Sequence, residues 1–532
     1  MLSNSPRSPS SPDLILTPTK ATRTVSRSRT LPLRMSPGRR ASIPTLEGVS
    51  LEISKLERLR RWILGLAIVN FDLDLGPVLT CVFPPAHLLP SEVENIAFSA
   101  FPDSPQFEEG SQIHSFRIRE SSSQEKRGSL SEPRSTSLSD GYIYGYSHFS
   151  QRKNLSLKRG YEQRSIVILS HYPYPALFFH VISKLGPLFH THGDPILEVA
   201  CHNIANWPSP APSTTIELGF LGSVFHAELP LSLDEQQLSS TAHLHSQTEQ
   251  DTHILVSAPP PTPPPLLLFE ASFSHLWTIW EVLILSEPLL VYGPSPAMTS
   301  QAVWWLRDLF RPIPWPGDFR PYFTIHDKEH NALVNNKRPK AGLLLGVTNP
   351  FFERACKHWP HSLSLGKPRP KGTKSMTPIA AGQSPGWKTK THKRYTLKDR
   401  QLLQEMEDAV QSGPQALDTA SANMRRHFSS RTAALLVPFN RYLNTLIPSP
   451  SEALHSSRSD RTPRLKPFNN VNFLASLKTH GTPLPFRSNS KQREFYERWL
   501  RTPAFGLWLA RQEEVVERVL RENAERGLGG QS

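Results

Sequence analysis

Prolines divide this chain into blocks. The sequence of 532 residues contains 51 prolines, about twice the ordinary usage of roughly 5%. Proline lacks a backbone N–H and interrupts both helices and central strands. Segments in which prolines gather are therefore poor material for a buried core, and we expect globular blocks separated by proline-rich stretches. Ordinary domain sizes predict two to four structural units for a chain of this length.

Cysteine usage and hydropathy indicate a cytoplasmic compartment. The three cysteines lie far apart and form no C-x-x-C pair, which argues against a disulfide framework and against a cysteine zinc site. No apolar run approaches the ~20 residues needed to span a bilayer, and the sequence opens without an apolar secretory segment. We therefore expect any membrane contact to be peripheral.

Positive charge gathers in two segments of this chain, whose formal net charge is +14. Eight basic residues lie between Arg7 and Arg40 with one acid among them, and residues 367–394 contain no acid. The second segment includes Lys367, Arg369, Lys371, Lys388, Lys390, Lys393 and Arg394. No aromatic platform accompanies either segment, so nucleic acid is not an expected partner. Solvated loops are the favoured interpretation, and contact with an anionic membrane or a protein partner is the alternative.

The first half of the chain is predicted to hold a tail, a mixed block and a linker. Residues 1–45 are rich in Ser, Pro and Arg and read as an intrinsically disordered tail. The block 59–228 opens with a hairpin of strands 62–69 and 78–83, and residues 121–140 form a polar insert. Further strands are expected at 113–118, 142–147 and 165–170, and helices at 92–101, 175–185 and 194–207. The linker covers 229–269; its prolines 259–265 indicate a polyproline spacer rather than a ligand for an SH3-type module.

The second half begins with a block, 270–366, in which helices and strands alternate. Helices are expected at 272–285, 295–310 and 351–359, and strands at 287–292, 319–325 and 342–347. Such alternation predicts an α/β fold with a parallel sheet. A basic loop, 367–394, then leads to a helical region, 395–527, with helices at 397–411, 421–446, 470–478 and 491–526.

Motifs of covalent chemistry are missing from the sequence. It has no phosphate-binding glycine loop, no dinucleotide fingerprint, no H-E-x-x-H and no nucleophile elbow. We expect no catalytic residue, cofactor or metal site. The pair His326 and Asp327 resembles a base with its orienting carboxylate, but neighbours on a strand point to opposite faces. Hydrogen bonding of both to the following loop is the favoured interpretation.

Two loops follow strands of the second block, at residues 292–296 and 348–351. Open α/β sheets bind their ligands and partners at the carboxyl ends of strands. Thr348 or Asn349 followed by Pro350 is also ordinary helix-start chemistry. Both interpretations, a binding surface and a pair of helix caps, stay open from the residues alone.

Several segments together carry a family resemblance over residues 59 to about 517. The most specific are 318–327 (DFRPYFTIHD), 346–352 (GVTNPFF) and 358–360 (HWP). Others are 69–76 (VNFDLDLG), 100–104, 156–161, 286–289, 438–442 and 495–508. With these motifs the chain resembles the DENN-domain proteins, and in particular their type-6 branch, which includes Rab exchange factors and fungal Arf-binding homologues. The inserts 121–140 and 231–265 follow no pattern of that family.

The resemblance implies a fold and an activity. The fold would be a tripartite α/β module: a longin-like N-terminal lobe, a doubly wound α/β lobe and a helical extension. The activity would be guanine-nucleotide exchange on a Rab-type small GTPase in vesicle and endosomal traffic, with the GTPase gripped between the lobes and its switch regions displaced. The expected contact residues are Phe71, Asp72 and Leu75 in the first lobe and Thr348, Asn349 and Phe351 in the second. Arg320, Tyr322 and Thr324 are expected to stabilise the sheet.

Two other activities are compatible with the same lobes. A GTPase-activating protein requires an arginine that reaches the γ-phosphate, for which Arg152 and Arg159 are candidates. An effector or polarity scaffold would instead bind a GTP-loaded Arf, or lipid through the basic loop, without changing the nucleotide state.

Overall fold

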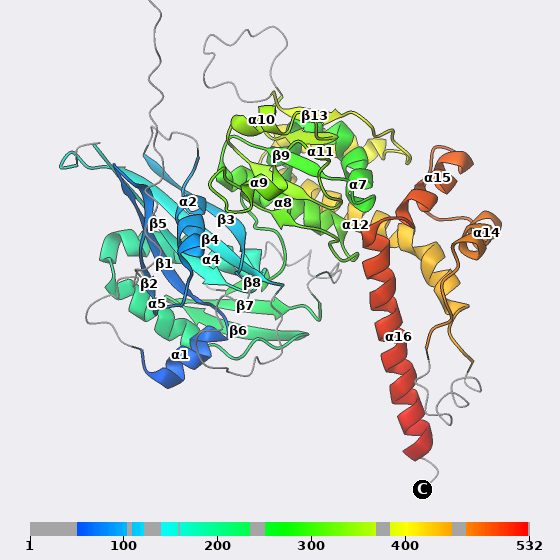
Figure 1. Cartoon of the computed structure of the whole chain (residues 1–532), viewed down its shortest axis with the longest axis horizontal. Coiled ribbons are helices and arrows are strands. Elements are labelled where there is room, and N and C mark those ends of the chain that lie inside the picture. The colour runs from blue at the N-terminus through cyan, green and yellow to red at the C-terminus, as the bar shows by residue number, and fades with distance from the viewer. Residues whose placement is uncertain are drawn as a thin grey trace, which may run out of the picture. The chain divides into compact units, whose positions relative to one another are not determined.

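The computed structural model describes residues 51–103, 109–121, 140–157, 160–232, 234, 251–368, 384–449 and 464–529 (Figure 1). The expected disordered tail and most of the polar insert 121–140 therefore lie outside the described residues. So do three of the basic candidates, Arg159, Arg369 and Lys371. We refer to the elements from α1 to β8 as the first lobe, to those from α6 to β13 as the second lobe, and to α11 to α16 as the helical region.

The first lobe is built on an antiparallel sheet with the strand order β2-β1-β5-β4-β3. Its strands are β1 (Gly65–Asp72), β2 (Gly76–Phe83), β3 (Gly110–Arg119), β4 (Tyr142–Lys153) and β5 (Tyr161–Ser170). The predicted hairpin is present, because Asp72 of β1 faces Gly76 of β2 across a tight turn. After α1 (Ile53–Arg60), the chain enters the sheet directly.

Helices cover both faces of this sheet, which explains the unbroken apolar run of β1. Leu66 and Ile68 pack with α4 (Pro175–His192) and α5 (Pro195–Ala205) in one core. Ala67 and Val69 point to the other face and pack beneath α2 (Pro90–Ser99) (Figure 1). A strand buried on both faces shows no polar alternation, so its sequence reads as continuous apolar residues.

The predicted linker is in part a folded segment. β6 (Thr214–Phe220), β7 (Ser223–Leu229) and β8 (Asp251–Leu255) form a second small sheet, in which β8 runs parallel to β7. Residues 256–264, which we call the proline strap, lead on to α6 (Pro265–Phe269). Pro259, Pro260 and Pro265 are buried. The interpretation of this stretch as a free polyproline spacer is therefore wrong: buried prolines still contribute apolar surface although they cannot extend a sheet.

The second lobe contains the predicted parallel sheet, with the strand order β10-β11-β9-β12-β13. The strands are β9 (Leu289–Tyr292), β10 (Phe319–Arg320), β11 (Leu344–Val347), β12 (His361–Ser364) and β13 (Gly386–Thr389). All neighbouring pairs run parallel except β12 and β13. The helices are η2 (Glu270–His275), α7 (Leu276–Ile284), α8 (Pro296–Phe310), α9 (His330–Leu333) and α10 (Phe351–Ala355). The α/β fold class is thus confirmed.

Two predicted elements of the second lobe differ from the structure. The expected strand 319–325 is only two residues long, because Pro321 has no N–H to extend the ladder. The expected basic loop 367–394 contains β13, which pairs antiparallel with β12 from Gly386 to Thr389. This strand was not recognised from the sequence because lysines alternate with other residues there, and a solvent-exposed edge strand needs few apolar side chains.

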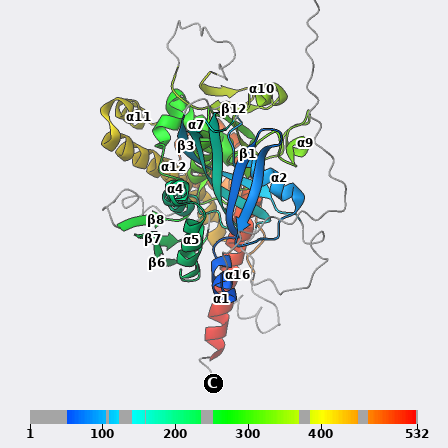
Figure 2. The same ribbon diagram turned by 90° about the vertical axis from the view of Figure 1, so that its left-hand side faces the viewer.

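The helical region follows with α11 (Arg400–Ser412), α12 (Pro414–Asn444), α14 (Asn470–His480), α15 (Asn489–Trp499) and α16 (Pro503–Gly529) (Figures 1 and 2). The single helix expected over 491–526 is two helices, divided just before Pro503, whose ring cannot continue the α15 hydrogen-bond ladder. In the part of the chain that the structure covers, no helix is both long and apolar enough to cross a membrane.

Candidate functional site

The turn between β1 and β2 presents two leucines to solvent. The Asp72 carboxylate closes this turn, with Oδ1 accepting hydrogen bonds from the backbone N–H of Leu75 (2.9 Å) and Asp74 (2.8 Å). These bonds stabilise the ionised form and lower the pKa of Asp72. Leu73 and Leu75 are 55% and 66% exposed. Asp72 therefore shapes the turn, and the leucines supply its apolar surface.

Phe71 connects this hairpin to the second lobe. Its ring lies 6.2 Å from that of Phe101, which follows α2. The hydroxyl of Tyr322, from the second lobe, donates to the Phe101 carbonyl (3.1 Å) and accepts from the Asp103 N–H (2.9 Å). Tyr322 is fully buried, and that burial raises its pKa well above 10. The end of the hairpin, the end of α2 and the second lobe are thus joined through one tyrosine.

The loop after β11 combines a helix cap with an exposed aromatic ring. Asn349 Oδ1 accepts from the N–H of Phe351 (2.9 Å), and its carbonyl accepts from the N–H of Phe352 (3.1 Å). Thr348 is buried, whereas Phe351 is 47% exposed at the start of α10. Helix-start chemistry therefore accounts for Asn349 but not for Phe351, whose exposure makes it a candidate contact.

The loop after β9 is explained by helix capping. Ser295 stands at the N-cap of α8, where its hydroxyl accepts from the N–H of Met298 (3.3 Å) and Pro296 is the first helical residue. The segment 292–296 is therefore assigned to positioning α8, and no further role follows from its contacts.

His326 and Asp327 do not form a pair. Asp327 Oδ1 accepts from the N–H of Glu329 (2.8 Å), as expected for a residue that orders the following loop. His326 stacks on Phe98 of α2, with ring centroids 3.9 Å apart, and burial lowers its pKa. The expectation that both side chains bond to the loop is correct for Asp327 and wrong for His326. Its ring is a contact between the lobes.

A buried network of charges holds β3 against β10. The Arg320 guanidinium is fully buried and binds Asp318 at 2.9 Å, Glu329, and the backbone carbonyl of Arg117 at 3.1 Å. Arg117 in turn binds Asp318 at 3.0 Å and the Phe319 carbonyl at 3.1 Å. Despite burial, Asp318 keeps a pKa below its ordinary value, because Arg320 and Arg117 stabilise its charge.

Arg320 and Tyr322 are expected to stabilise the sheet. Arg320 bonds Asp318 and Glu329 of its own lobe, and both Arg320 and Tyr322 also bond backbone carbonyls of the first lobe, so they fix the contact between the lobes as well. Thr324 is fully buried, and its hydroxyl accepts from the N–H of His326 (3.3 Å). All three residues are structural in these contacts.

The basic candidates lie at the far edge of the second sheet. Lys388 is on β13, and Lys367, Lys390 and Lys393 are exposed beside it, while Arg394 is half-buried. The ammonium of Lys390 bonds the backbone carbonyl of Lys357. In the first lobe, Arg152 is exposed near the end of β4.

The structure adds apolar residues that the sequence alone did not single out. Leu73 is exposed in the β1–β2 turn, and Ile325 is exposed beside His326. In Figures 1 and 2 the turn between β1 and β2 and helix α10 both lie toward the upper end of the molecule. We call Leu73, Leu75, Ile325 and Phe351 the apolar seam residues. The alternation of apolar and acidic residues in 71–76 is a signal by which Leu73 could have been found. Nothing in the sequence marks Ile325 as exposed, because it stands in an apolar run predicted to be a buried strand.

Metal chemistry finds no support in the described residues. No group of three or more His, Cys, Asp and Glu side chains there is arranged to hold a metal ion. The three cysteines are free and buried, and burial raises the pKa of the Cys81 thiol to about 11.

Sequence comparison with known proteins identifies the family of this chain. It matches no family model. Over 512 residues it is 30% identical to Protein DENND6A of mouse, covering 91% of this chain and 83% of that protein. It is 31% identical to human Protein DENND6B over 469 residues (85% and 79%), and 29% identical to the DENND6 homolog of Dictyostelium discoideum over 525 residues (85% and 70%). With its α/β fold and the motifs given above, the chain belongs to the DENND6 family of DENN-domain proteins.

Proposed function

We propose that this protein is a guanine-nucleotide exchange factor for a Rab-type small GTPase. DENN-domain proteins are in general exchange factors of this kind. The proposal rests on the arrangement of the loops where the first lobe meets the second lobe. The β1–β2 turn and the loop after β11 belong to different lobes and both carry exposed apolar side chains, and Phe71, Phe101 and Tyr322 join the first of these loops to the second lobe. A partner that touches both loops engages the two lobes at once.

The proposed mechanism needs no reacting side chain. An exchange factor binds the nucleotide-free GTPase more tightly than the loaded form, and by reciprocity it weakens the partner's hold on nucleotide. GTP and Mg²⁺ belong to the partner, whose switch loops depend on them. Displacement of those loops is the step that favours GDP release.

Within the site, residues divide into contacts and supports. Leu75 and Phe351 offer exposed apolar surface, and buried aromatic anchors supply much of the energy of protein interfaces. Asp72 and Asn349 hold the backbone of the two loops through their own hydrogen bonds. The side chains of Phe71 and Thr348 lie beneath the exposed surface of these two loops. We assign the first pair to direct contact and the others to loop geometry.

The basic edge around β13 fits peripheral recruitment. Its exposed lysines, Lys367, Lys388, Lys390 and Lys393, form a cationic rim. Each basic residue near an anionic leaflet contributes about 1 kcal/mol of attraction. We propose that this edge meets an endosomal or other trafficking membrane while the seam faces the GTPase.

Release of a fluorescent guanine nucleotide from a panel of purified Rab and Arf GTPases tests the proposal. We expect the full chain to accelerate release from a Rab. Phe351→Ala and Leu75→Ala should each slow this by about tenfold or more, since truncating a hot-spot side chain costs roughly 2 kcal/mol. Leu397→Ala is the matched control for Phe351, because Leu397 is equally exposed, at 47%, in the segment that leads into α11; it should leave release unchanged.

Other outcomes assign a different role. Stimulated GTP hydrolysis that is lost in Arg152→Ala would identify a GTPase-activating protein. Tighter binding of a GTP-loaded Arf than of the empty form, without faster release from any GTPase, would identify an effector or scaffold. Equal loss of exchange in Leu397→Ala and Phe351→Ala would reject the seam as the contact surface.

A further inference from the structure

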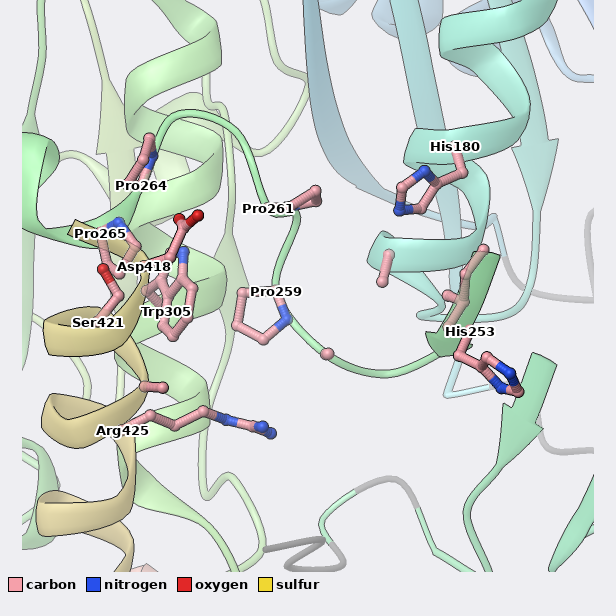
Figure 3. Close-up of a pocket in the computed structure, with 14 residues that line it drawn as sticks. His180, His253, Pro259, Pro261, Pro264, Pro265, Trp305, Asp418, Ser421 and Arg425 are labelled. Atoms are coloured by element: carbon pink, nitrogen blue, oxygen red, sulfur yellow. The ribbon is translucent and has the colours of Figure 1, made fainter. Parts of the chain in front are cut away.

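The cavity beneath the proline strap is a packing space rather than a site for a partner (Figure 3). Its volume is about 40 Å³, and one water needs roughly 10–15 Å³ by this kind of measure, so it holds no more than a few waters. Arg425 and Asp418 bring one charge of each sign to its wall. The groups that can select a macromolecular partner lie on the outer surface instead, beside the apolar seam residues.

Helix α10 has a buried inner face and an exposed outer face. Phe352 and Cys356 are buried and lie four positions apart, so they share the inner face. Phe351 and Arg354 are three positions apart and both exposed, which places them side by side on the outer face. A partner that touches Phe351 therefore also meets the guanidinium group of Arg354.

The cationic surface continues beyond the end of α10. Lys357 is exposed on the following turn, where its N–H donates to the Arg354 carbonyl (3.3 Å). The ring of His358 bonds the backbone carbonyl of Lys337 (3.0 Å), which brings the exposed Lys337 and Arg338 beside this turn. We call Arg354, Lys357, Lys337 and Arg338 the α10 cations. None of the four forms an ion pair with another described residue, so their charges are available to a partner.

One acid stands among these cations. Glu353 is exposed on α10, and its charge acts on Tyr292 at the end of β9, since burial and then Glu353 raise the pKa of that tyrosine. Glu353 therefore lies toward the end of β9. Four cations and one carboxylate leave this surface with three positive charges in excess.

The first-lobe loop carries the opposite sign. Its residues 72–75 contain two acids, Asp72 and Asp74, and no base. The backbone N–H groups of Leu75 and Asp74 lower the pKa of Asp72, so its carboxylate is charged at neutral pH. Asp74 is exposed between the exposed Leu73 and Leu75. The apolar side chains are thus bordered by acids in the first lobe and by cations in the second.

We propose that these charges fix the orientation of the GTPase: it meets the α10 cations with an acidic surface and the β1–β2 turn with a basic one. The inference rests on the proposed function, in which one partner touches both loops. Opposite charges across an interface speed association and exclude partners with the wrong pattern. A GTPase with the reverse pattern would meet like charges at both loops, so the same residues select among GTPases.

An anionic membrane fits this surface less well than a protein does. Acidic lipids attract basic residues, but a leaflet that covered both loops would also face Asp72 and Asp74. The edge around β13 has no acid between residues 386 and 394 and suits a membrane better. The two cationic surfaces are therefore assigned to different partners.

Association of the full chain with the nucleotide-free form of the Rab whose release it accelerates, followed by stopped-flow fluorescence, tests this orientation. Arg354→Glu combined with Lys357→Glu should slow association about tenfold or more at about 50 mM salt, and the deficit should shrink at about 300 mM salt as screening increases. Asp74→Lys should slow association about threefold under the same conditions.

Arg400→Glu combined with Lys478→Glu is the matched control. It makes the same change in net charge at exposed cations of α11 and α14, and it should leave association within about twofold of the wild-type rate, because steering depends on charges near the contact. A deficit of equal size at both salt concentrations in the Arg354 and Lys357 variant would overturn the electrostatic role of these residues.

The remaining outcomes separate this inference from the proposed function. Unchanged association in either test variant, beside exchange that Phe351→Ala still abolishes, would overturn the orientation and leave exchange standing. If the double variant lost binding only to phosphatidylserine vesicles, the α10 cations would belong to a membrane contact and the inference would be wrong. Exchange on no GTPase would overturn the proposed function and this inference with it.

Discussion

At Asp103, burial and charge are in conflict. The residue follows α2 at the seam, where Tyr322 accepts its backbone N–H. Its own Oδ2 is buried and without a partner among the described residues. Desolvation raises the pKa of this carboxyl group to about 7, although a hydrogen bond with Tyr322 opposes the shift. The folded state therefore binds the Asp103 proton more tightly than the unfolded chain does.

This raised pKa predicts a pH-dependent effect of Asp103→Asn. Stability from the protonated carboxyl is fully present below pH ~4 and is lost as pH rises through about 7. The neutral amide avoids that loss, so the variant should be more stable than the wild type by about 1–3 kcal/mol at pH 8. The difference should shrink toward pH 4. Urea unfolding of both proteins at several pH values measures it, and a pH-independent difference would contradict the assignment.

Single residues of the site were predictable only where their role is local. The turn of Asp72 and the cap of Asn349 are set by neighbours two or three positions away, so sequence patterns reveal them. Tyr322 acts on residues about 220 positions away, at Phe101 and Asp103. His326 likewise finds Phe98 only through the tertiary fold. No local pattern encodes such contacts, which is why the residues that join the lobes read as sheet or loop residues.

At the scale of elements, strong periodicity predicted most of the framework. The β1–β2 hairpin, the α4 and α8 helices and the parallel order of the second sheet follow from apolar runs bounded by turn residues. β8 was not predicted from the sequence because it is only five residues long and stands next to the proline strap. β13 was not predicted because it is a strand of four residues, one of which is a lysine. Short strands depend on their neighbours for burial, and those neighbours are far away in sequence.

The correction at β8 has a measurable consequence. Ile254 is almost fully buried in the core of the first lobe. Ile254→Ala should lower the free energy of unfolding by about 2–4 kcal/mol through lost burial and the cavity left behind. Thr262→Ala, an exposed side chain on the proline strap, should change it by less than about 0.5 kcal/mol. Chemical denaturation distinguishes the two; equal small effects would restore the spacer interpretation.

At the scale of the whole molecule, one buried carboxylate attaches the helical region to the second lobe. Glu281 of α7 is fully buried and accepts from Thr396 N (2.6 Å), Thr396 Oγ1 (2.7 Å) and Tyr395 N (3.0 Å). It also bonds His392 (2.8 Å), whose pKa is raised because bonds to Glu281 and Glu287 outweigh its desolvation. The segment leading into α11 is thereby fixed to the core of the lobe.

Removal of this carboxylate should loosen the helical region selectively. Glu281→Ala leaves the backbone N–H groups of 395–396 without their acceptor and removes one of the two carboxylates beside His392, which costs about 3–5 kcal/mol for a broken buried pair. Amide hydrogen exchange should then accelerate by more than about 100-fold in residues 392–396 and in α15. The first sheet should keep its protection. Glu407→Ala, an exposed position on α11, is the control, and uniform acceleration across the chain would argue against a local anchor.

The strand order of the second sheet also bears on self-association. One of its edges, β10, is covered by β3 through the bonds between Arg117 and the Phe319 carbonyl and between Arg320 and the Arg117 carbonyl. Among the described strands none pairs with the outer side of β13, the other edge, which carries Lys388. A bare edge strand is a template for pairing with a second molecule, and a lysine on it opposes such pairing. Lys388 on this strand thus opposes pairing of the sheet with that of a second copy.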